Sequence, residues 1–296
     1  MESDTASSAQ PKVITIIGGA GGMGRLFRRE LEAAGHEVRV LDKDDWHRWE
    51  PLLADVDLVL LSVPIEHVME GIEQLAGKLG RDQLLADVTS IKVKPIRKMR
   101  EVHAGPVLGL HPMFGPTTKR LQGQLIVDCG GRRPHAFAWF LETLRGLGAK
   151  MIKASADEHD RMMAFVQVAR HFASFAYGVH LFEENADLDR MMAFSSPIYR
   201  LEMGMVGRLF AQDPHLYAEI IFSSEVGKQQ LRHYHNHLGE MVELVERGDK
   251  DAFIDYFKNV SAWYGELGRQ FLDESSYIID KLTEYTREPA AEEVSS

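Results

Sequence analysis

Residues 13–24, VITIIGGAGGMG, join a β-branched apolar run to five glycines, and a helix-like segment follows over 23–34. Gly19, Gly21 and Gly24 fit the spacing G-x-G-x-x-G. In a strand–turn–helix unit these glycines serve a tight turn, close approach of a pyrophosphate and close helix packing, in that order. The phosphate charge then lies at the helix N-terminus. We predict a dinucleotide site with contacts from Gly19, Gly21, Gly22, Met23 and Gly24. The alternative is a glycine-rich turn that binds nothing.

Asp42 ends the next apolar run, EVRVLD, 18 residues after Gly24. An acidic side chain at this place accepts hydrogen bonds from a ribose 2′-hydroxyl and repels a 2′-phosphate, which favours NAD over NADP. Lys43, directly after it, weakens this preference. Ligands of such sheets bind beyond the carboxyl ends of the strands, so we also expect cofactor contacts from the turn Ser62, Val63 and Pro64.

Short apolar runs recur seven times between residues 12 and 154 and alternate with helix-like segments, which indicates a mostly parallel sheet covered by helices. After Ser155 long amphipathic stretches take over. We expect an α/β fold class, with an N-terminal Rossmann-type dinucleotide-binding domain followed by an all-α C-terminal domain of about five helices. The predicted divisions are a disordered lead (1–11), the dinucleotide-binding domain (12–154), a helical domain for substrate binding and dimerisation (155–287) and a disordered tail (288–296).

Capping residues mark the expected helix ends of the second half. Ser155 and Glu158 have the spacing of a capping box. Ser196 and Asp213 each precede a proline, which is favoured at the first helical position. Gly248 is placed to end a helix, and the aspartate after it to begin the next.

The composition excludes some functions. The chain has 296 residues and a formal net charge of −10, which argues against nucleic-acid binding, since phosphates are bound by clustered lysine and arginine. Cys129 is the single cysteine and forms no internal disulfide, so we expect a reducing, cytoplasmic location. No signal peptide is recognisable, and no run reaches the roughly 18 apolar residues that suggest a membrane-spanning helix.

His111 follows the apolar run PVLGL and precedes a proline-rich loop, at the expected cofactor edge of the sheet. A histidine there can accept a hydroxyl proton while hydride leaves the same carbon. It can equally be a histidine that only holds the loop by a hydrogen bond, and the spacing favours neither interpretation.

The helical half carries polar residues that suit an anion. Arg200 and Arg208 flank Gly204 and Gly207, which leaves room for a ligand between two groups suited to binding carboxylates. The alternative is a pair of surface ion pairs.

A stripe of polar and small residues marks one face of the helix after Ser155. Gln167, His171, Ser174 and Gly178 recur at helical spacing on an otherwise apolar segment. The stripe either lines a wet cavity, which we favour, or packs on a polar face of another helix.

Three histidines, in the run HYHNH (residues 233–237), invite a metal interpretation. We predict no metal site, because hydride transfer needs none and no second set of ligands is evident.

Six segments resemble the prephenate dehydrogenases of tyrosine biosynthesis, and in particular the dehydrogenase part of bifunctional chorismate mutase/prephenate dehydrogenases. They are GGAGGMGRLF, DVTSIK, GLHPMFGP, EHDRMMAF, RHFASFAYG and SSPIYRLEMGMVGRLFAQDP. The resemblance runs from about residue 12 to about residue 280. It implies NAD-dependent oxidation of prephenate to 4-hydroxyphenylpyruvate with loss of carbon dioxide.

The resemblance also implies roles for single residues. His111 accepts a hydrogen bond from the ring hydroxyl of the substrate, and Ser90 and Lys92 lie near the nicotinamide and that hydroxyl. We therefore assign catalytic roles to all three.

By the same resemblance, Arg208 binds the ring carboxylate and Arg200 supports the site. His171 lies in the substrate pocket and is tied to feedback inhibition by tyrosine. The helical domain forms an intertwined homodimer in relatives.

Other readings stay open. Arogenate differs from prephenate only in its side chain and is the nearest rival substrate. Two-domain hydroxyacid dehydrogenases and imine reductases share the glycine motif, but they carry an N-x-x-x-K pattern, and residues 160–175 contain no lysine. A non-catalytic NAD-binding regulator is a third possibility. Only a short polar lead precedes VITII, so we expect no mutase activity.

Overall fold

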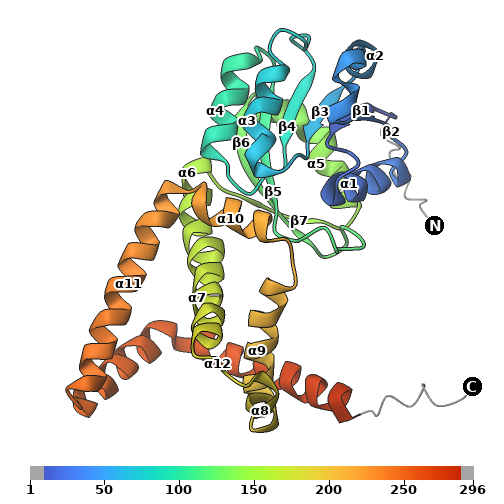
Figure 1. The fold of residues 1–296 in the computed structure, drawn as a ribbon. Helices are drawn as coiled ribbons and strands as arrows, with labels where there is room; N and C mark the ends of the chain where they lie inside the picture. The colour runs from blue at the N-terminus through green and yellow to red at the C-terminus, as the bar shows by residue number, and fades with distance from the viewer. Residues whose placement is uncertain (1–9, 288–296) are drawn as a thin grey trace, which may run out of the picture. The chain divides into compact units, whose positions relative to one another are not determined.

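The computed structural model of the chain describes residues 10–287 (Figure 1). The predicted disordered tail, and all but the last two residues of the predicted lead, lie outside the described residues. The chain divides into two compact units, and each is described by itself. The first takes the described residues up to Val166 together with Ala218–Gly227, and the second takes Gln167–Tyr217 and the described residues from Lys228 on. The predicted division at 154/155 stays a prediction.

A seven-stranded sheet forms the centre of the first unit, in the order β2-β1-β3-β4-β5-β6-β7. All neighbours are parallel except β5 and β6. The strands are β1 (Val13–Ile17), β2 (Glu37–Leu41), β3 (Leu58–Leu61), β4 (Leu84–Asp87), β5 (Val107–Pro112), β6 (Leu125–Arg132) and β7 (Lys150–Lys153). Each of the seven predicted runs overlaps one of these strands, so the mostly parallel sheet is confirmed.

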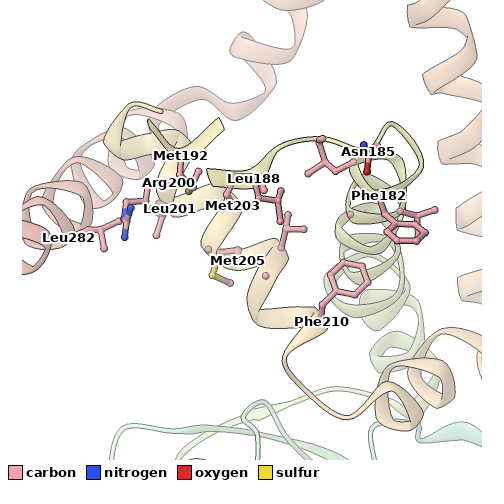
Figure 2. Close-up of a pocket in the computed structure, with 17 residues that line it drawn as sticks. Phe182, Asn185, Leu188, Met192, Arg200, Leu201, Met203, Met205, Phe210 and Leu282 are labelled. Atoms are coloured by element: carbon pink, nitrogen blue, oxygen red, sulfur yellow. The ribbon is translucent and has the colours of Figure 1, made fainter. Parts of the chain in front are cut away.

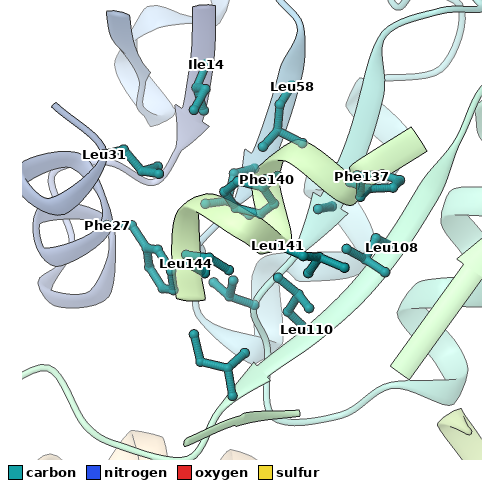
Figure 3. Close-up of a cluster of buried hydrophobic side chains, with 14 of the residues drawn as sticks. Ile14, Phe27, Leu31, Leu58, Leu108, Leu110, Phe137, Phe140, Leu141 and Leu144 are labelled. Atoms are coloured by element: carbon teal, nitrogen blue, oxygen red, sulfur yellow. The ribbon is translucent and has the colours of Figure 1, made fainter. Parts of the chain in front are cut away.

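Both faces of the sheet are buried, as is typical of parallel sheets covered by helices. Successive residues of a strand point to opposite faces. On β3, Leu58 and Leu60 accordingly join one apolar cluster, while Val59 and Leu61 join another. Figure 3 shows the first cluster, in which phenylalanine and leucine side chains of α1 and α5 meet leucines of β3 and β5.

Helices lie between most consecutive strands of the first unit, and one follows the last strand. They are α1 (Gly22–Ala33), α2 (Trp49–Leu53), α3 (Ile65–Gln74), α4 (Val93–Val102), α5 (Ala138–Gly146) and α6 (Ala156–Met163), with 3-10 turns over Lys43–Arg48 and Pro134–Phe137. The predicted capping box begins α6, where the Ser155 side chain accepts from the Glu158 amide and the Glu158 side chain faces the Ser155 amide. This prediction is confirmed.

The second half of the chain is helical, with more helices than predicted. After α6 come a π-helical turn (Ala164–Ala169), α7 (Arg170–Glu183), α8 (Leu188–Ala193), α9 (Pro197–Phe210), α10 (Pro214–Phe222), α11 (Glu225–Glu246) and α12 (Lys250–Arg287). Seven α-helices therefore lie between residues 155 and 287, and the last of them, α12, is kinked at Gly265 (φ 53°), against the expected five or so. One missed break lies at Asn185, whose φ of 52° ends α7, and Asp187 then caps α8 through the Arg190 amide.

The remaining cap predictions hold. Ser196 accepts from the Tyr199 amide at the start of α9. Asp213 accepts from the second amide of α10 at 2.9 Å. Gly248, with φ of 68°, follows α11, and Asp249 accepts from the Ala252 amide at the start of α12.

Candidate active site

The glycine turn lies between the end of β1 and the start of α1. The Gly21 amide donates to the Gly18 carbonyl oxygen at 3.1 Å, so Gly19 lies within the tight turn as predicted, and the left-handed residue of this turn is Gly18, with φ of 81°. Gly19 must be small for another reason, because a Cβ there would lie 2.7 Å from the Val40 side chain on β2. At Gly24 a Cβ would lie 2.2 Å from the Gly18 carbonyl oxygen, which confirms close packing of helix on turn.

The turn fits a pyrophosphate. Gly21 is the N-cap of α1 and offers no side chain to its amides, so the helix N-terminus is left to a ligand or to water. β1 lies between β2 and β3, which makes the gap beyond β1 and β3 the switch point where such sheets bind nucleotides. The turn after β3 lies close by, since a Cβ on Gly18 would lie 2.6 Å from the Ser62 carbonyl oxygen. The buried Ser62 hydroxyl has no hydrogen-bond partner among the described residues.

The other predicted cofactor residues follow the same edge. Asp42 directly follows β2, caps the 3-10 turn after it, and accepts from the Ala20 amide at 3.4 Å. It therefore lies beside the glycine turn, where a ribose acceptor is expected. Met23 is half-buried in the first turn of α1, and Val63 and Pro64 lead into α3. Their contacts with a cofactor stay predictions.

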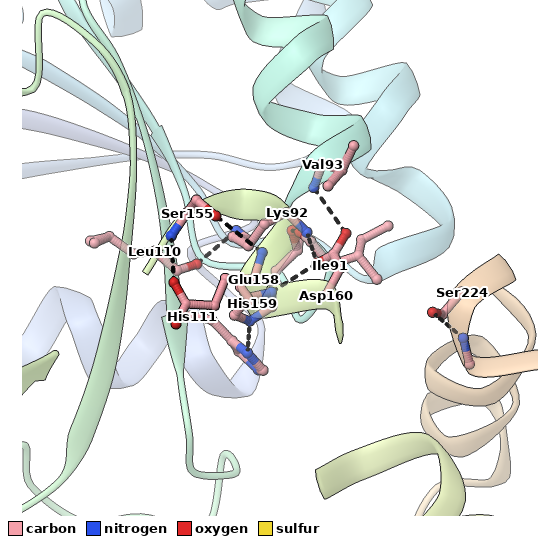
Figure 4. A network of polar contacts seen from close by, with 12 residues as sticks. Ile91, Lys92, Val93, Leu110, His111, Ser155, Glu158, His159, Asp160 and Ser224 are labelled. Carbon is pink, nitrogen blue, oxygen red and sulfur yellow. Dashed lines mark hydrogen bonds and ion pairs between the residues drawn. The ribbon is translucent and has the colours of Figure 1, made fainter. Parts of the chain in front are cut away.

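His111 lies on β5 near its carboxyl end and is 4% exposed. Its Nδ1 is 2.7 Å from Nε2 of His159, and Nδ1 of His159 is 2.8 Å from a carboxylate oxygen of Asp160 (Figure 4). Burial, followed by the nearby His159 and Lys92, holds the pKa of His111 well below its ordinary value. The residue is therefore neutral at pH 7 and able to accept a proton.

Asp160 binds the N-terminus of another helix. Its two carboxylate oxygens accept from the amides of Lys92 at 2.9 Å and Val93 at 3.1 Å, where α4 begins. Burial alone would raise the pKa of Asp160, but the hydrogen bonds from His159, Val93 and Lys92 outweigh it, and the pKa lies below its ordinary value. The carboxylate is charged and held in one orientation.

Lys92 is fully buried, with its ammonium bound to the Asp87 carboxylate and, at 2.7 Å, to the Leu110 carbonyl oxygen. It thus joins the strand that carries His111 to the end of β4, while its own amide holds Asp160. As placed, the ammonium faces protein groups, so a direct catalytic role for Lys92 stays a prediction. Ser90 is half-buried in the turn between β4 and α4.

The sequence prediction missed His159 and Asp160. They stand in the quoted segment EHDRMMAF, on the first turn of α6, but nothing local distinguishes them from solvated helix residues. The signal is their pairing with a strand residue 48 positions earlier, which only the fold reveals.

The second unit carries the remaining predicted site residues. Arg200 and Arg208 are exposed on α9, and neither forms an ion pair with a described residue, so the alternative of surface ion pairs is not seen. The His171 ring on α7 is half-buried and packs edge-on against Tyr217, with 5.0 Å between ring centres. Burial, followed by Arg170, lowers the pKa of His171.

An apolar cavity of about 840 Å³ lies in the second unit between α7, α8 and α9, with Leu282 of α12 on its wall (Figure 2). Arg200, Phe182, Met203 and Phe210 are among its lining residues. Arg208 is not one of them.

The polar stripe on α7 does not behave as predicted along its whole length. Ser174 accepts from Arg170 at 2.6 Å, within the same helix. Gly178 packs on an aromatic ring, since a Cβ there would lie 2.1 Å from Phe210 of α9. Gly178 also lines the apolar cavity, so at this end the stripe contacts both a neighbouring helix and a cavity with an apolar lining.

Residues 10–287 also bear on metal binding and on membrane insertion. No group of three or more His, Cys, Asp or Glu side chains there is arranged to hold a metal ion. None of the helices in this range is long and apolar enough to cross a membrane.

Known proteins resemble this chain over nearly its whole length. The T-protein of Enterobacter agglomerans is 50% identical over 266 residues, which are 90% of this chain and 71% of that protein. The T-protein of Haemophilus influenzae is 43% identical over 271 residues, 92% of this chain and 72% of that protein. The fold is similar to a prephenate dehydrogenase of A. aeolicus in complex with hydroxyphenyl propionate and NAD+, with a TM-score of 0.72 at 19% identity, over 88% of this chain and all of that one.

Family models match both halves of the chain. The nucleotide-binding domain of prephenate dehydrogenase matches residues 29–153, and the dimerization domain of prephenate dehydrogenase matches residues 155–259. The first model covers β2 to β7 but begins after β1 and the glycine turn, and the second covers α6 to α11. The chain belongs to the prephenate dehydrogenase family.

Proposed function

We propose that this chain oxidises prephenate with NAD to 4-hydroxyphenylpyruvate, carbon dioxide and NADH, as a step of tyrosine biosynthesis. One observation carries the proposal: a buried, neutral histidine, His111, lies at the same edge of the sheet as the glycine turn that fits a pyrophosphate. The identity of the substrate is inferred from membership of the family.

The reaction needs one base. NAD, held by the glycine turn at residues 18–24 and by Asp42, would supply the acceptor for the hydride of the carbinol carbon. His111 takes the hydroxyl proton as that carbon becomes a carbonyl carbon. Breaking the bond to the ring carboxylate then releases carbon dioxide and sends its electron pair into the ring, which becomes aromatic. The proton held at His111 returns to the oxygen, which is now phenolic, so the protein gains no net proton.

The substrate is a dianion, and the chain carries a net charge of −10, so local cations must bind it. Arg208 is the proposed partner of the ring carboxylate, and Arg200 supports the site. Both guanidinium groups are exposed and outside ion pairs with described residues, as a carboxylate site requires. His171 contributes to the substrate pocket.

Three further proposals concern the partner, an inhibitor and the location. The matched dimerization domain and the exposed aromatic side chains of α12, Trp263 and Phe257 among them, favour a homodimer through the helical domain. Inhibition by tyrosine is proposed from the likeness of product and inhibitor. The cytoplasm is proposed from the single cysteine.

The decisive experiment mixes the purified protein with prephenate or arogenate and with NAD or NADP, and follows absorbance of the reduced cofactor together with carbon dioxide release. We expect turnover with prephenate and NAD, and at least about tenfold lower kcat/KM with NADP because Asp42 repels the 2′-phosphate. NAD binding without turnover would favour the alternative that the protein is a non-catalytic, NAD-binding regulator. Higher kcat/KM with arogenate would make that the substrate.

A further inference from the structure

His111 is the first member of a chain of three side chains. Hydrogen bonds link His111 on β5 to His159 on α6, and His159 to Asp160. The Nδ1–Nε2 distance between the two rings is 2.7 Å, and the distance from His159 Nδ1 to the Asp160 carboxylate is 2.8 Å (Figure 4). All three lie in the first unit. His111 and His159 are 4% and 2% exposed, so their rings are shielded from bulk water.

With both rings neutral, the hydrogen bonds fix which nitrogen of each ring carries its proton. A carboxylate only accepts, so the His159 Nδ1 donates to Asp160 and the neutral His159 keeps a lone pair on Nε2. That lone pair accepts from the Nδ1–H of His111. The Nε2 of His111 is then the nitrogen with a lone pair, as a base for a hydroxyl proton requires.

The charges around the two rings favour placing an additional proton on His159 rather than on His111. Lys92 lies near His111 and disfavours its cation, whereas the Asp160 carboxylate is bonded to His159. Asp87 at the end of β4 is bound to the Lys92 ammonium, and Asp128 on β6 lies across from Leu110. Glu158, beside His159 on α6, is exposed, and its carboxylate accepts from the Ser155 amide.

We propose that His159 and Asp160 are positioning residues for His111, and that the hydroxyl proton of the substrate is stored on His159 during the reaction. His111 Nε2 takes the proton, while its Nδ1 proton passes to Nε2 of His159. His111 is again neutral, and His159 becomes an imidazolium beside Asp160. The reverse transfer returns the proton to the phenolic oxygen. The kinetic role rests on the proposed function, whereas the protonation pattern does not.

The protonation pattern is tested without turnover. In protein labelled with 15N-histidine, NMR at pH 8 reports which ring nitrogens carry protons, and the His111→Asn and His159→Asn variants assign the signals. We expect Nδ1–H and bare Nε2 for both rings. A proton on Nε2 of His111 would overturn the proposal, whatever the enzyme does with prephenate.

The relay is tested by kinetics. We expect His159→Asn and Asp160→Asn to lower kcat about 10- to 100-fold with KM for prephenate within about twofold, because the base loses its orientation and proton store. Without the carboxylate, the acid limb of the kcat–pH profile should move to lower pH by about one unit in Asp160→Asn. A merely structural role would not move this limb. Asp160→Glu should restore part of the activity.

Two variants serve as matched controls. Glu158→Gln removes a neighbouring carboxylate that does not bind His159, and His103→Asn removes a buried histidine whose Nε2 meets the Gln83 carbonyl instead. Both should leave the pH profile unchanged. Thermal melting and NADH binding show that each variant is folded. An unchanged kcat and acid limb in Asp160→Asn and His159→Asn, with an active parent enzyme, would refute the relay. An inactive parent would instead refute the proposed function and leave the NMR result to decide the protonation pattern.

Discussion

The charged and proton-accepting groups assigned to the candidate site have opposite surroundings in the two units. In the first unit, Lys92, His111 and His159 are buried and each is hydrogen-bonded to a protein partner. In the second, Arg200 and Arg208 are exposed and form no ion pair with a described residue. A buried network holds fixed protonation states, because low dielectric makes every unpaired charge costly. An exposed guanidinium can instead exchange water for a carboxylate. The difference separates proton handling from substrate capture.

The largest expected effect tests the proton-handling side. His111→Asn removes the base, so we expect kcat to fall about 10³-fold while KM for prephenate changes little, since general bases contribute roughly 10²- to 10⁴-fold. Initial rates and prephenate binding measured by calorimetry separate the two effects. If kcat is retained, His111 only holds the loop after β5.

The substrate-capture side is tested by Arg208→Ala. A charge-assisted hydrogen bond contributes about 1.5–3 kcal/mol, so we expect KM for prephenate to rise about 10- to 100-fold with a smaller change in kcat. Arg247→Ala is the matched control, because that arginine is exposed and 3.7 Å from Glu243 in the same unit. A KM that equals the control's would place the ring carboxylate on another cation.

The same division explains what could be predicted from the sequence. The glycine turn, the strands and the caps at Ser155 and Ser196 depend on neighbours within a few residues, so local patterns reveal them. The tight turn at Gly19 lies where the motif predicts it, whereas the left-handed φ falls at Gly18, a position that the motif does not specify. His159 could not be found in this way, since its role depends on α6 packing beside a strand 48 residues earlier. Sequence shows that Arg208 lies near small residues, but not whether another side chain neutralises it.

The smallest expected effect concerns stability. His111 has a folded pKa well below the ordinary value of 6.5, so the unfolded chain binds the extra proton between these two values. The contribution of His111 to the free energy of unfolding is therefore fully present above pH 6.5. As the pH falls below 6.5, this contribution is lost by up to about 1.4 kcal/mol per pH unit. His36, His103 and His171 shift in the same direction, so the chain should lose stability between pH 6.5 and 5.

Urea unfolding at pH 5, 6 and 7 measures this loss. His111→Asn should make the pH dependence shallower by about one proton's contribution, whereas Arg208→Ala should leave it unchanged, because an arginine does not titrate in this range. Equal slopes in the His111→Asn variant and the parent would mean that His111 is not held neutral by burial. His111 would then not be a neutral base inside a buried network, and the proposed difference between this network and the exposed anion site would be wrong.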